Sequence, residues 1–225
     1  FISSSTPTKT GALRPSPSAE GGFQFSSVNM DTLLSGQQKS MDVPEVEIQD
    51  KIHFVFNNLS STNLDSKEKE TMQFLEHHHV DFLAHYVVVK RASIEPNHHE
   101  MYISFLDRLA VHLHALMPKI LDRSYENVRI LLNSEKIVSS SSERLLLKSL
   151  GSWIGALTVA RNRPILRRDL DLKELLLDAY SNGRLIAVVP FVSKVLIPSR
   201  LSRIFKPSNP WLLAILRLLK EIYIV

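Results

Sequence analysis

From residue 44 onward, apolar side chains recur at intervals of three and four, which is the period of an amphipathic helix. In "PEVEIQDKIHFVFNNL" these positions are Ile48, Ile52, Val55, Phe56 and Leu59. The same spacing predicts further helices at 66–90, 97–113, 119–135, 139–160, 169–183, 184–196 and 209–225, with the valine-rich stretches 86–90 and 187–192 the weakest. No stretch alternates apolar and polar residues as a strand does, so the chain is predicted to be all-α.

Several of these boundaries carry capping residues. The serine run before Glu143 is typical of a helix N-terminus. Aspartates open the 169–183 segment, and Gly183 is placed to close it. Pro96 disfavours helical geometry at Glu95 and therefore ends the segment before it. These signals predict separate, capped helices joined by short connections.

The number and spacing of the helices predict a repeat architecture. About eight helices in residues 45–225 make four pairs of about 45 residues, and helical pairs of the HEAT type repeat every ~40–47 residues. Each pair buries its apolar stripe against its neighbours and cannot stand alone. The sequence therefore predicts a HEAT-repeat-like alpha solenoid over residues 45–225.

Residues 1–44 have a different composition: they are rich in Ser, Thr, Pro and Gly, and their apolar residues follow neither a helical nor a strand period. Such a segment cannot bury enough apolar surface to offset its ordering entropy, so we expect a disordered linker, with only "VNMDTLL" able to dock locally. Because the first residue is Phe1, we expect a fragment, and we expect no signal peptide since a long apolar core is missing. No apolar run approaches the ~18 residues of a membrane span.

Composition and charge narrow the function classes. The chain has no cysteine, which removes disulfides, Cys-ligated zinc and thiol nucleophiles and fits a reducing compartment. Residues 45–140 carry ten basic and fourteen acidic side chains, whereas residues 141–225 carry fourteen basic and six acidic ones, a net charge of +8. Such an excess favours acidic partners or nucleic acid on that side, or simply forms solvated helix faces.

A collinear series of blocks resembles a known family. The blocks are "VNMDTLL", "KIHFVFNNLS", "VVVKRASIEPNHHEMYISFLD", "ENVRILLNSEK", "RLLLKSLGSWIGALTVARNRPILRRDLDLKELLLDAY", "AVVPFVSKVL" and "PSNPWLLAILRLLKEIY". Together they resemble the central MIF-four-G domain of the Not-one scaffold subunit of the CCR–NOT deadenylase complex. The short segment after Gly183 resembles the plant form most. "RNRPILRRDLDL" is more basic than the family pattern, "IPSRLSRIFKPSNPW" differs from the usual linker, and the last repeat is expected to be incomplete at Val225.

The resemblance implies a non-catalytic scaffold without cofactors. It implies docking of a Caf-one-type deadenylase, with the Ccr-four-type nuclease through it, and of a DEAD-box helicase of the decapping-activating type. Other CCR–NOT subunits would join through the rest of the scaffold. The outcome would be poly(A) shortening, translational repression and mRNA decay in the cytoplasm, including P-bodies, and in the nucleus. The alternative is a MIF-four-G module of translation initiation or mRNA surveillance that binds RNA and a helicase but no deadenylase.

The histidines raise a metal-dependent hydrolase as a third class. His77, Asp81 and His85 follow at four-residue spacing and would share one helical face. A third ligand, a second shell and a spacing such as HExxH are not visible. Packed or solvated histidines explain the pattern better, so no metal site is expected. The chain also lacks GxSxG, a P-loop and a paired general acid and base, and no catalytic residue is expected.

One connection is a candidate for partner binding. "KRASIEPNHHE" joins two predicted helices, and loops at one edge of a solenoid commonly bind partners. By the resemblance, the helicase-binding candidates in it are Lys90, Arg91, Glu95, Asn97 and His98. The alternative is that Pro96 and Asn97 only cap the next helix.

The second candidate is the basic stretch between two later helices, which contains Arg161, Arg163, Arg167 and Arg168. Asp169 and Asp171 partly neutralise it, and it lacks the interleaved aromatic residues that would read bases. We interpret it as a basic corner that contacts partners or, weakly, RNA, and a purely solvated corner is equally compatible. The large aromatic residues Trp153, Trp211 and Phe191 are expected to anchor the core between repeats.

Overall fold

The computed structural model describes residues 42–224, so that the predicted linker 1–44 and the "VNMDTLL" patch lie outside it apart from the last three linker residues. The described α-helices are α2 (Val46–Asn57), α3 (Leu64–Thr71), α4 (Val80–Tyr86), α5 (His99–His112), α6 (Leu116–Asn133), α7 (Ser141–Leu157), α8 (Leu172–Ser181), α9 (Leu185–Leu196) and α10 (Pro210–Ile224). Shorter turns are the 3-10 helices η1 (His77–His79), η3 (Pro96–His98), η4 (Val159–Arg161) and η5 (Ile197–Leu201) and the π-helix η2 (Val87–Ala92). Because residues 42–224 contain no strand, the all-α prediction is confirmed.

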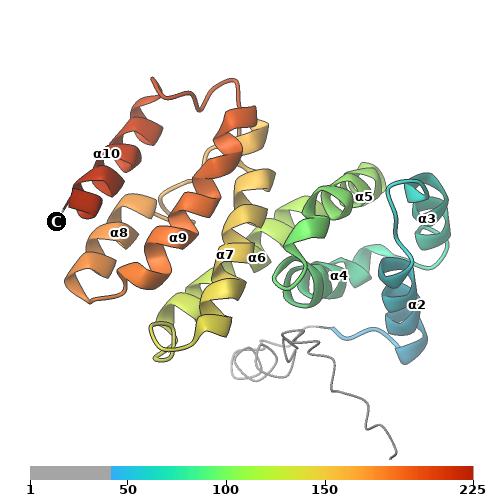
Figure 1. Ribbon diagram of the computed structural model, residues 1–225. Coiled ribbons are helices and arrows are strands. Elements are labelled where there is room, and N and C mark those ends of the chain that lie inside the picture. Colours follow the sequence, from blue (N-terminus) through green and yellow to red (C-terminus); the bar gives the residue numbers. More distant parts are fainter. Residues whose placement is uncertain (1–41, 225) are drawn as a thin grey trace, which may run out of the picture.

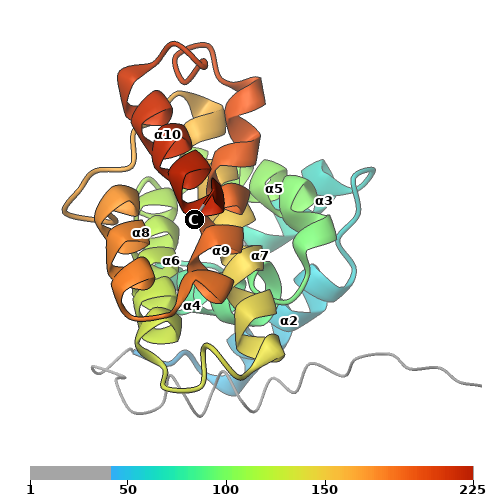
Figure 2. The same cartoon turned by 60° about the vertical axis from the view of Figure 1, so that its left-hand side comes forward.

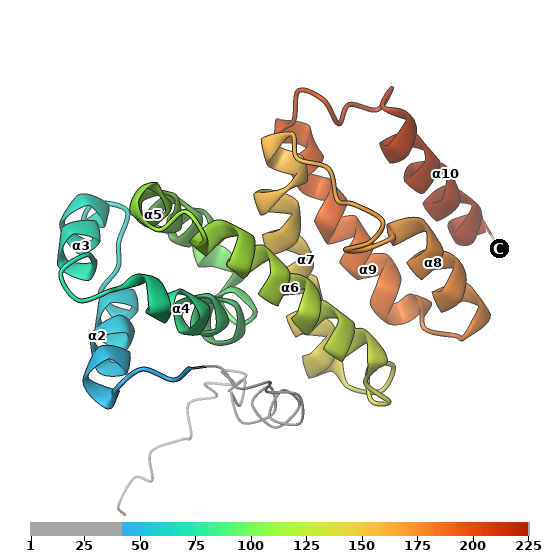
Figure 3. The same ribbon diagram turned by 180° about the vertical axis from the view of Figure 1, so that it is seen from behind.

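The helices stack in chain order from one end of the molecule to the other (Figure 1), with α2 and α3 at one end and α10 at the other. Some helices pack on their neighbour in sequence, as α6 does on α7 and α8 on α9. Others pack on the helix two places along, as α4 does on α6, α7 on α9 and α8 on α10. The view from behind (Figure 3) shows the same order, and the view turned by 60° (Figure 2) looks onto the end of the stack that holds α8 and α10. This pattern of near-neighbour contacts confirms the solenoid prediction.

The tightest packing in the stack joins α7 to α9. Gly151 and Gly155 lie one turn apart on α7, and a Cβ atom added to them would lie 2.8 Å from the carbonyl oxygen of Phe191 and 2.4 Å from that of Val195. Both distances are too short for any residue other than glycine. The two glycines therefore allow the backbones of α7 and α9 to approach directly, and Phe191 is completely buried there.

The long helix expected over 66–90 is wrong, because the structure breaks it between α3 and α4. The chain leaves α3 at Met72, buries Leu75 and starts again at η1. Glu76 is the N-cap of η1, and its backbone N–H donates to Nδ1 of His79 at 3.1 Å. The side chain of Glu76 in turn accepts from the backbone of His79. This reciprocal capping starts a new helix direction without the serine or threonine that usually signals one.

The valine-rich stretch that follows is a π-helix rather than an α-helix. Ser93 N donates to Val88 O at 3.1 Å, a bond that spans five residues. The π-helix ends at Ala92, whose carbonyl oxygen accepts hydrogen bonds from Nε2 of His99 and from Oγ of Ser149, each at 2.7 Å. This carbonyl at the end of the helix is therefore bonded to side chains of both α5 and α7.

The predicted caps of α7 and α8 are confirmed. Ser140 Oγ accepts from the backbone of Glu143 at 3.2 Å. Asp171 accepts from the backbone N–H groups of Lys173 and Glu174. Gly183 has a left-handed conformation, φ +68°. The backbone N–H of Arg184, the next residue, donates to the carbonyl oxygen of Ala179 at 2.8 Å and so ends α8. These bonds satisfy backbone groups that a helix end would otherwise leave without partners.

Trp153 and Phe191 are core residues, as predicted, and Trp211 is only half-buried. Trp153 on α7 donates from Nε1 to Ser124 Oγ on α6 at 3.1 Å and meets the ring of His99 edge to face. It therefore joins three consecutive helices of the stack. No helix of the described part is both long and apolar enough to cross a bilayer.

Candidate functional site

The first candidate surface, residues 90–98, is built around a polar network that faces inward. Arg91 lies on the π-helix and donates to the hydroxyl of Tyr86 through Nε at 2.8 Å and through Nη2 at 2.6 Å. It also pairs with Glu95 at 3.2 Å and donates to the side chain of Asn57 on α2. Glu95 accepts from the hydroxyl of Tyr102 on α5. Arg91 therefore ties α2, the π-helix and α5 together.

The electrostatics of the network follow from its burial. Burial raises the pKa of the Tyr102 hydroxyl, and the neighbouring Glu95 carboxylate raises this pKa further. Burial also raises the pKa of Tyr86, although its hydrogen bond from Arg91 acts in the opposite direction. Both phenols therefore stay protonated at neutral pH, Tyr102 as a donor to Glu95 and Tyr86 as an acceptor from Arg91.

The five helicase-binding candidates thus divide into two groups. Arg91 and Glu95 are half-buried and paired with each other in the network. Asn97 and His98 lie exposed on η3, and Lys90 is half-buried on the π-helix. Pro96 begins η3, as the capping alternative predicted. The exposed part of this surface is therefore the turn at 96–98, where His98 Nδ1 lies 3.6 Å from the Glu95 carboxylate.

In the arginine corner, Arg161 has a structural role. Its guanidinium makes two hydrogen bonds with the carboxylate of Asp107, from Nη1 to Oδ1 at 2.8 Å and from Nη2 to Oδ2 at 2.5 Å. Because a paired arrangement of this kind fixes the planar group in one orientation, Arg161 holds η4 against α5. It is consequently not a free cation.

The other arginines of the corner are exposed. Arg167 Nε bonds to Asp171 at 2.7 Å, and Arg168 lies 3.6 Å from Asp169. Burial alone would raise the pKa of Asp171, but backbone N–H bonds and Arg167 outweigh it and hold this pKa below its usual value. Arg163 makes no side-chain ion pair within residues 42–224. The structure places Arg167 beside Asp171 and Arg168 beside Asp169, in agreement with the partial neutralisation predicted for the corner.

The two predicted sets do not form one site. Arg161 contacts α5 through Asp107, whereas the 90–98 network uses Asn57 and Tyr102, and no hydrogen bond within the described part joins the sets. Beside the corner is an open hollow of about 390 Å³ between α6, α8 and α9, which mixes both charges on its lining: Arg129, Arg167, Arg168, Arg184, Asp169, Asp171, Glu174 and Asp178. Neither set is a pocket for a single charged ligand.

The histidines are distributed rather than gathered. His79 is buried as part of the η1 cap, and burial lowers its pKa, which suits its ring nitrogen as an acceptor. His77 is exposed on η1, and His85 lies on α4. Across residues 42–224, no group of three or more His, Asp or Glu side chains has an arrangement that could hold a metal ion.

Sequence reasoning missed two features of this surface. One is the role of Asn162, which lies between two of the arginines in a left-handed conformation, φ +61°. Its side-chain oxygen accepts from Ser202 and from the backbone of Arg203. The other is the exposed connection between α9 and α10. Its signal is readable in "IPSRLSRIFK", where aliphatic and basic residues alternate outside any helical period.

Comparison with known proteins identifies the family. Residues 40–225 match the family model described as the CCR4-NOT transcription complex subunit 1 CAF1-binding domain. The chain is 42% identical over 218 residues to CCR4-NOT transcription complex subunit let-711 of Caenorhabditis elegans, covering 92% of this chain and 8% of that protein. It is also 37% identical over 199 residues to general negative regulator of transcription subunit 1 of Schizosaccharomyces pombe, covering 85% of this chain and 9% of that protein.

The corresponding protein of Saccharomyces cerevisiae is 35% identical over 177 residues, or 78% of this chain and 8% of its own length. The chain thus spans less than a tenth of each of these curated relatives. The family model covers every described helix of the stack. The predicted resemblance to a Not-one scaffold subunit is therefore confirmed, and this chain belongs to the family of CCR4-NOT transcription complex subunit 1 CAF1-binding domains.

Proposed function

We propose that this chain is a non-catalytic docking domain that binds a CAF1-type deadenylase within a CCR4-NOT scaffold. The observation that carries the proposal is the family match over residues 40–225, which includes the whole helical stack. Through the deadenylase the domain would also hold a Ccr-four-type nuclease. It would support poly(A) shortening, translational repression and mRNA decay in the cytoplasm, including P-bodies, and in the nucleus.

Finer features of the proposal follow from the family resemblance. We propose that the helical stack is of the MIF-four-G type, nearest to the plant form, and that it forms one domain over residues 45–225 after a linker. An elongated stack of helix pairs suits docking, because stacked repeats form an extended surface on which a partner can bind. Exposed apolar side chains that a folded partner would cover include Phe54 on α2 and Tyr180 on α8.

The deadenylase proposal predicts a stable complex. When the 225-residue chain is mixed with a purified CAF1-type deadenylase, we expect a one-to-one complex in gel filtration with multi-angle light scattering. Alone, the chain should not shorten a poly(A) RNA. Phe54→Glu and Tyr180→Glu should both fold, because each side chain is more than half exposed. Weaker deadenylase binding by either variant would locate the contact at that residue. Binding of a helicase without any binding of the deadenylase would favour the initiation or surveillance alternative instead.

We also propose that the turn at 96–98 contributes to docking a DEAD-box helicase. The exposure of Asn97 and His98 supports this assignment, whereas Arg91 and Glu95 act by holding the turn in place. Exposed Arg163, Arg167 and Arg168 would add weak, salt-sensitive attraction for RNA or an acidic partner. Other CCR-NOT subunits would bind elsewhere on the longer scaffold.

The division of the 90–98 surface gives a paired prediction. Asn97→Ala with His98→Ala should weaken helicase binding while changing the free energy of unfolding by less than about 0.5 kcal/mol, as exposed substitutions do. Arg91→Ala should lower the free energy of unfolding by about 2 kcal/mol, because Tyr86 and Glu95 lose a charged partner in a half-buried network. Urea unfolding and a helicase titration measure the two effects. If the Arg91→Ala chain is as stable as wild type, Arg91 has no structural role in the network and is again a candidate for helicase binding.

A further inference from the structure

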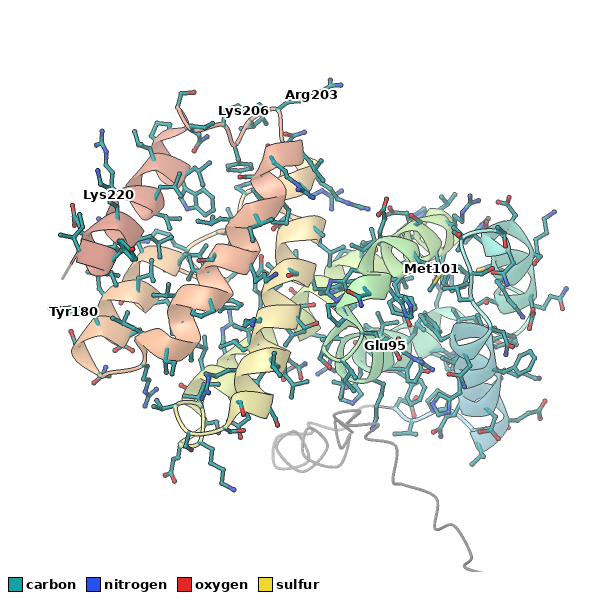
Figure 4. The ribbon with its side chains drawn as sticks, in the orientation of Figure 1. Glu95, Met101, Tyr180, Arg203, Lys206 and Lys220 are labelled. Atoms are coloured by element: carbon teal, nitrogen blue, oxygen red, sulfur yellow. The ribbon has the colours of Figure 1, made fainter. Side chains whose placement is uncertain are left out.

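The turn between α8 and α9 contains a chemically reactive pair of residues. Asn182 is followed by Gly183, and no other glycine of the chain follows an asparagine. Both residues are exposed, and Figure 4 shows Tyr180, two residues before Asn182, at the outer edge of the molecule. In such a pair the backbone nitrogen of the glycine can attack the side-chain amide of the asparagine, because glycine has no Cβ atom that shields its nitrogen.

The backbone nitrogen of Gly183 is unhindered and makes no hydrogen bond. A Cβ atom added to Gly183 would meet no heavy atom within 4 Å. Within residues 42–224, no hydrogen bond uses the N–H of Gly183, whereas the next N–H, that of Arg184, donates to Ala179 O at 2.8 Å. The nitrogen that would attack Asn182 therefore has no hydrogen bond to break before it reacts.

Other exposed asparagines lack this combination. Asn133 is exposed as Asn182 is, but the nitrogen after it belongs to Ser134, which has a side chain. That nitrogen also donates to Leu131 O at 3.2 Å, so it is already engaged. Asn209 precedes Pro210, whose nitrogen carries no proton that could be lost. Exposure alone therefore does not select Asn182, whereas exposure together with a free glycine nitrogen does.

Asp178 restrains the reactive amide. Nδ2 of Asn182 donates to Oδ1 of Asp178 at 2.8 Å and to the backbone oxygen of Asp178 at 3.1 Å. Asn182 is the C-cap of α8, with ψ at 9°. Attack requires rotation about this bond and release of the amide from Asp178, because the nitrogen and the side-chain carbon must come within about 3–3.5 Å. The hydrogen bonds to Asp178 therefore slow the reaction in the folded chain.

We propose that Asn182 is a site of spontaneous deamidation in the folded chain, with water as the only co-reactant and with Asp178 limiting the rate. The nitrogen of Gly183 loses its proton to solvent and bonds to Cγ of Asn182. The bond from Cγ to Nδ2 breaks and ammonia leaves, which closes a succinimide ring. Water then adds to one of the two ring carbonyl carbons and opens the ring, giving aspartate or isoaspartate at position 182. No atom is oxidised or reduced.

The product changes the junction between α8 and α9. It replaces a neutral donor by a carboxylate that lies one turn from Asp178 and at the negative end of α8, and both are unfavourable. Isoaspartate also adds a methylene group to the main chain, next to the bond from Arg184 N to Ala179 O that ends α8. The guanidinium of Arg184 donates to Leu132 O on α6 at 3.1 Å. Deamidation is therefore expected to loosen the last turn of α8 and its link to α6.

The test incubates the 225-residue chain at physiological temperature and follows two tryptic peptides by mass spectrometry, ELLLDAYSNGR (174–184) and ILLNSEK (130–136). We expect Asn182 to deamidate at least tenfold faster than Asn133, with more isoaspartate than aspartate. The rate should rise with pH, because the attacking nitrogen must lose a proton. Aspartate without isoaspartate would mean direct hydrolysis and would overturn the proposal. So would a folded chain that stays intact while the free synthetic peptide 174–184 reacts.

Matched variants test the role of each residue. Asp178→Ala should deamidate at least fivefold faster than wild type with an unchanged circular dichroism spectrum, because the amide loses its carboxylate acceptor. Asp122→Ala removes an exposed carboxylate from α6 instead, and it should leave the rate within twofold. An unchanged rate in Asp178→Ala, or equal acceleration in both variants, would overturn the limiting role of Asp178. Gly183→Ala should slow the reaction at least tenfold, and an equal rate would overturn the attack by this nitrogen.

Two further measurements test the consequence and the setting. Asn182→Asp copies the charge of the product, and amide protons of residues 177–184 should exchange faster in it than in wild type while those of α7 do not change. Equal exchange in 177–184 would overturn the expected loosening. Because the curated relatives are much longer, the incubation is repeated on a chain extended past Val225. The rate there should stay within twofold, since residues of α8 and α9 form the turn, and protection by the added residues would overturn the proposal.

Discussion

Gly155→Ala is expected to destabilise the domain by about 2 kcal/mol, although the same substitution in most helices is stabilising by about 1 kcal/mol. The added methyl group would lie 2.4 Å from Val195 O and 3.1 Å from Pro198 Cγ. A backbone oxygen cannot move aside as a flexible side chain can, so α7 and α9 must separate. Overpacking of this kind costs ~1–3 kcal/mol, which exceeds the gain in helix propensity.

The measurement is urea unfolding followed by circular dichroism at 222 nm. Gly155→Leu should be worse, by at least about 3 kcal/mol, because leucine is also a good helix former and the difference can come only from the clash. Ser152→Ala is the matched control, since Ser152 lies on the same helix and is half exposed. A Gly155→Ala chain more stable than wild type would mean that α7 and α9 do not approach as closely as the structure has them.

The second large effect is expected at Trp153. Trp153→Ala should lower the free energy of unfolding by about 4 kcal/mol, within the ~3–5 kcal/mol typical of large aromatic residues cut to alanine in a core. The side chain is completely buried, and it contacts His99 on α5 and Ser124 on α6. The cavity would therefore open between three helices rather than at an edge of the stack.

Trp153→Phe separates packing from hydrogen bonding. Phenylalanine keeps an aromatic ring beside His99 but lacks the Nε1 donor to Ser124. Ser124 still donates to Ile120 O at 2.7 Å, so its hydroxyl keeps one partner and the loss should stay near about 1–2 kcal/mol. Thermal and urea unfolding of both variants measure the difference. Equal losses in the alanine and phenylalanine variants would assign the effect to the hydrogen bond instead of to buried volume.

Local patterns predicted the features of the fold that local physics controls. The serine cap before Glu143, the Asp171 cap and Gly183 were readable because each satisfies backbone groups a few residues away. The break at 72–79 was missed because Glu76 and His79 cap η1 in place of the usual serine and glutamate. Helical periodicity continued through it on both sides, which made two helices look like one.

Contacts between distant residues were beyond the sequence. Arg91 reads as an exposed loop cation, since its partner Asn57 lies 34 residues earlier and the five-residue step to Tyr86 has no meaning in an α-helix. Arg161 reads as part of a basic run, because Asp107 is 54 residues away. The partner class came from the resemblance, whereas the hydrogen bonds that Asn162 accepts from Ser202 and Arg203 became visible only in three dimensions.

The carbonyl oxygen of Ala92 has a consequence for how the stack opens. Repeat arrays usually fray one unit at a time from their ends, and amide protons exchange with solvent as each unit opens. Here one acceptor receives hydrogen bonds from both His99 and Ser149. Opening the π-helix therefore breaks contacts to α5 and α7 in the same event. We therefore expect the amide protons of the π-helix, α5 and α7 to exchange together.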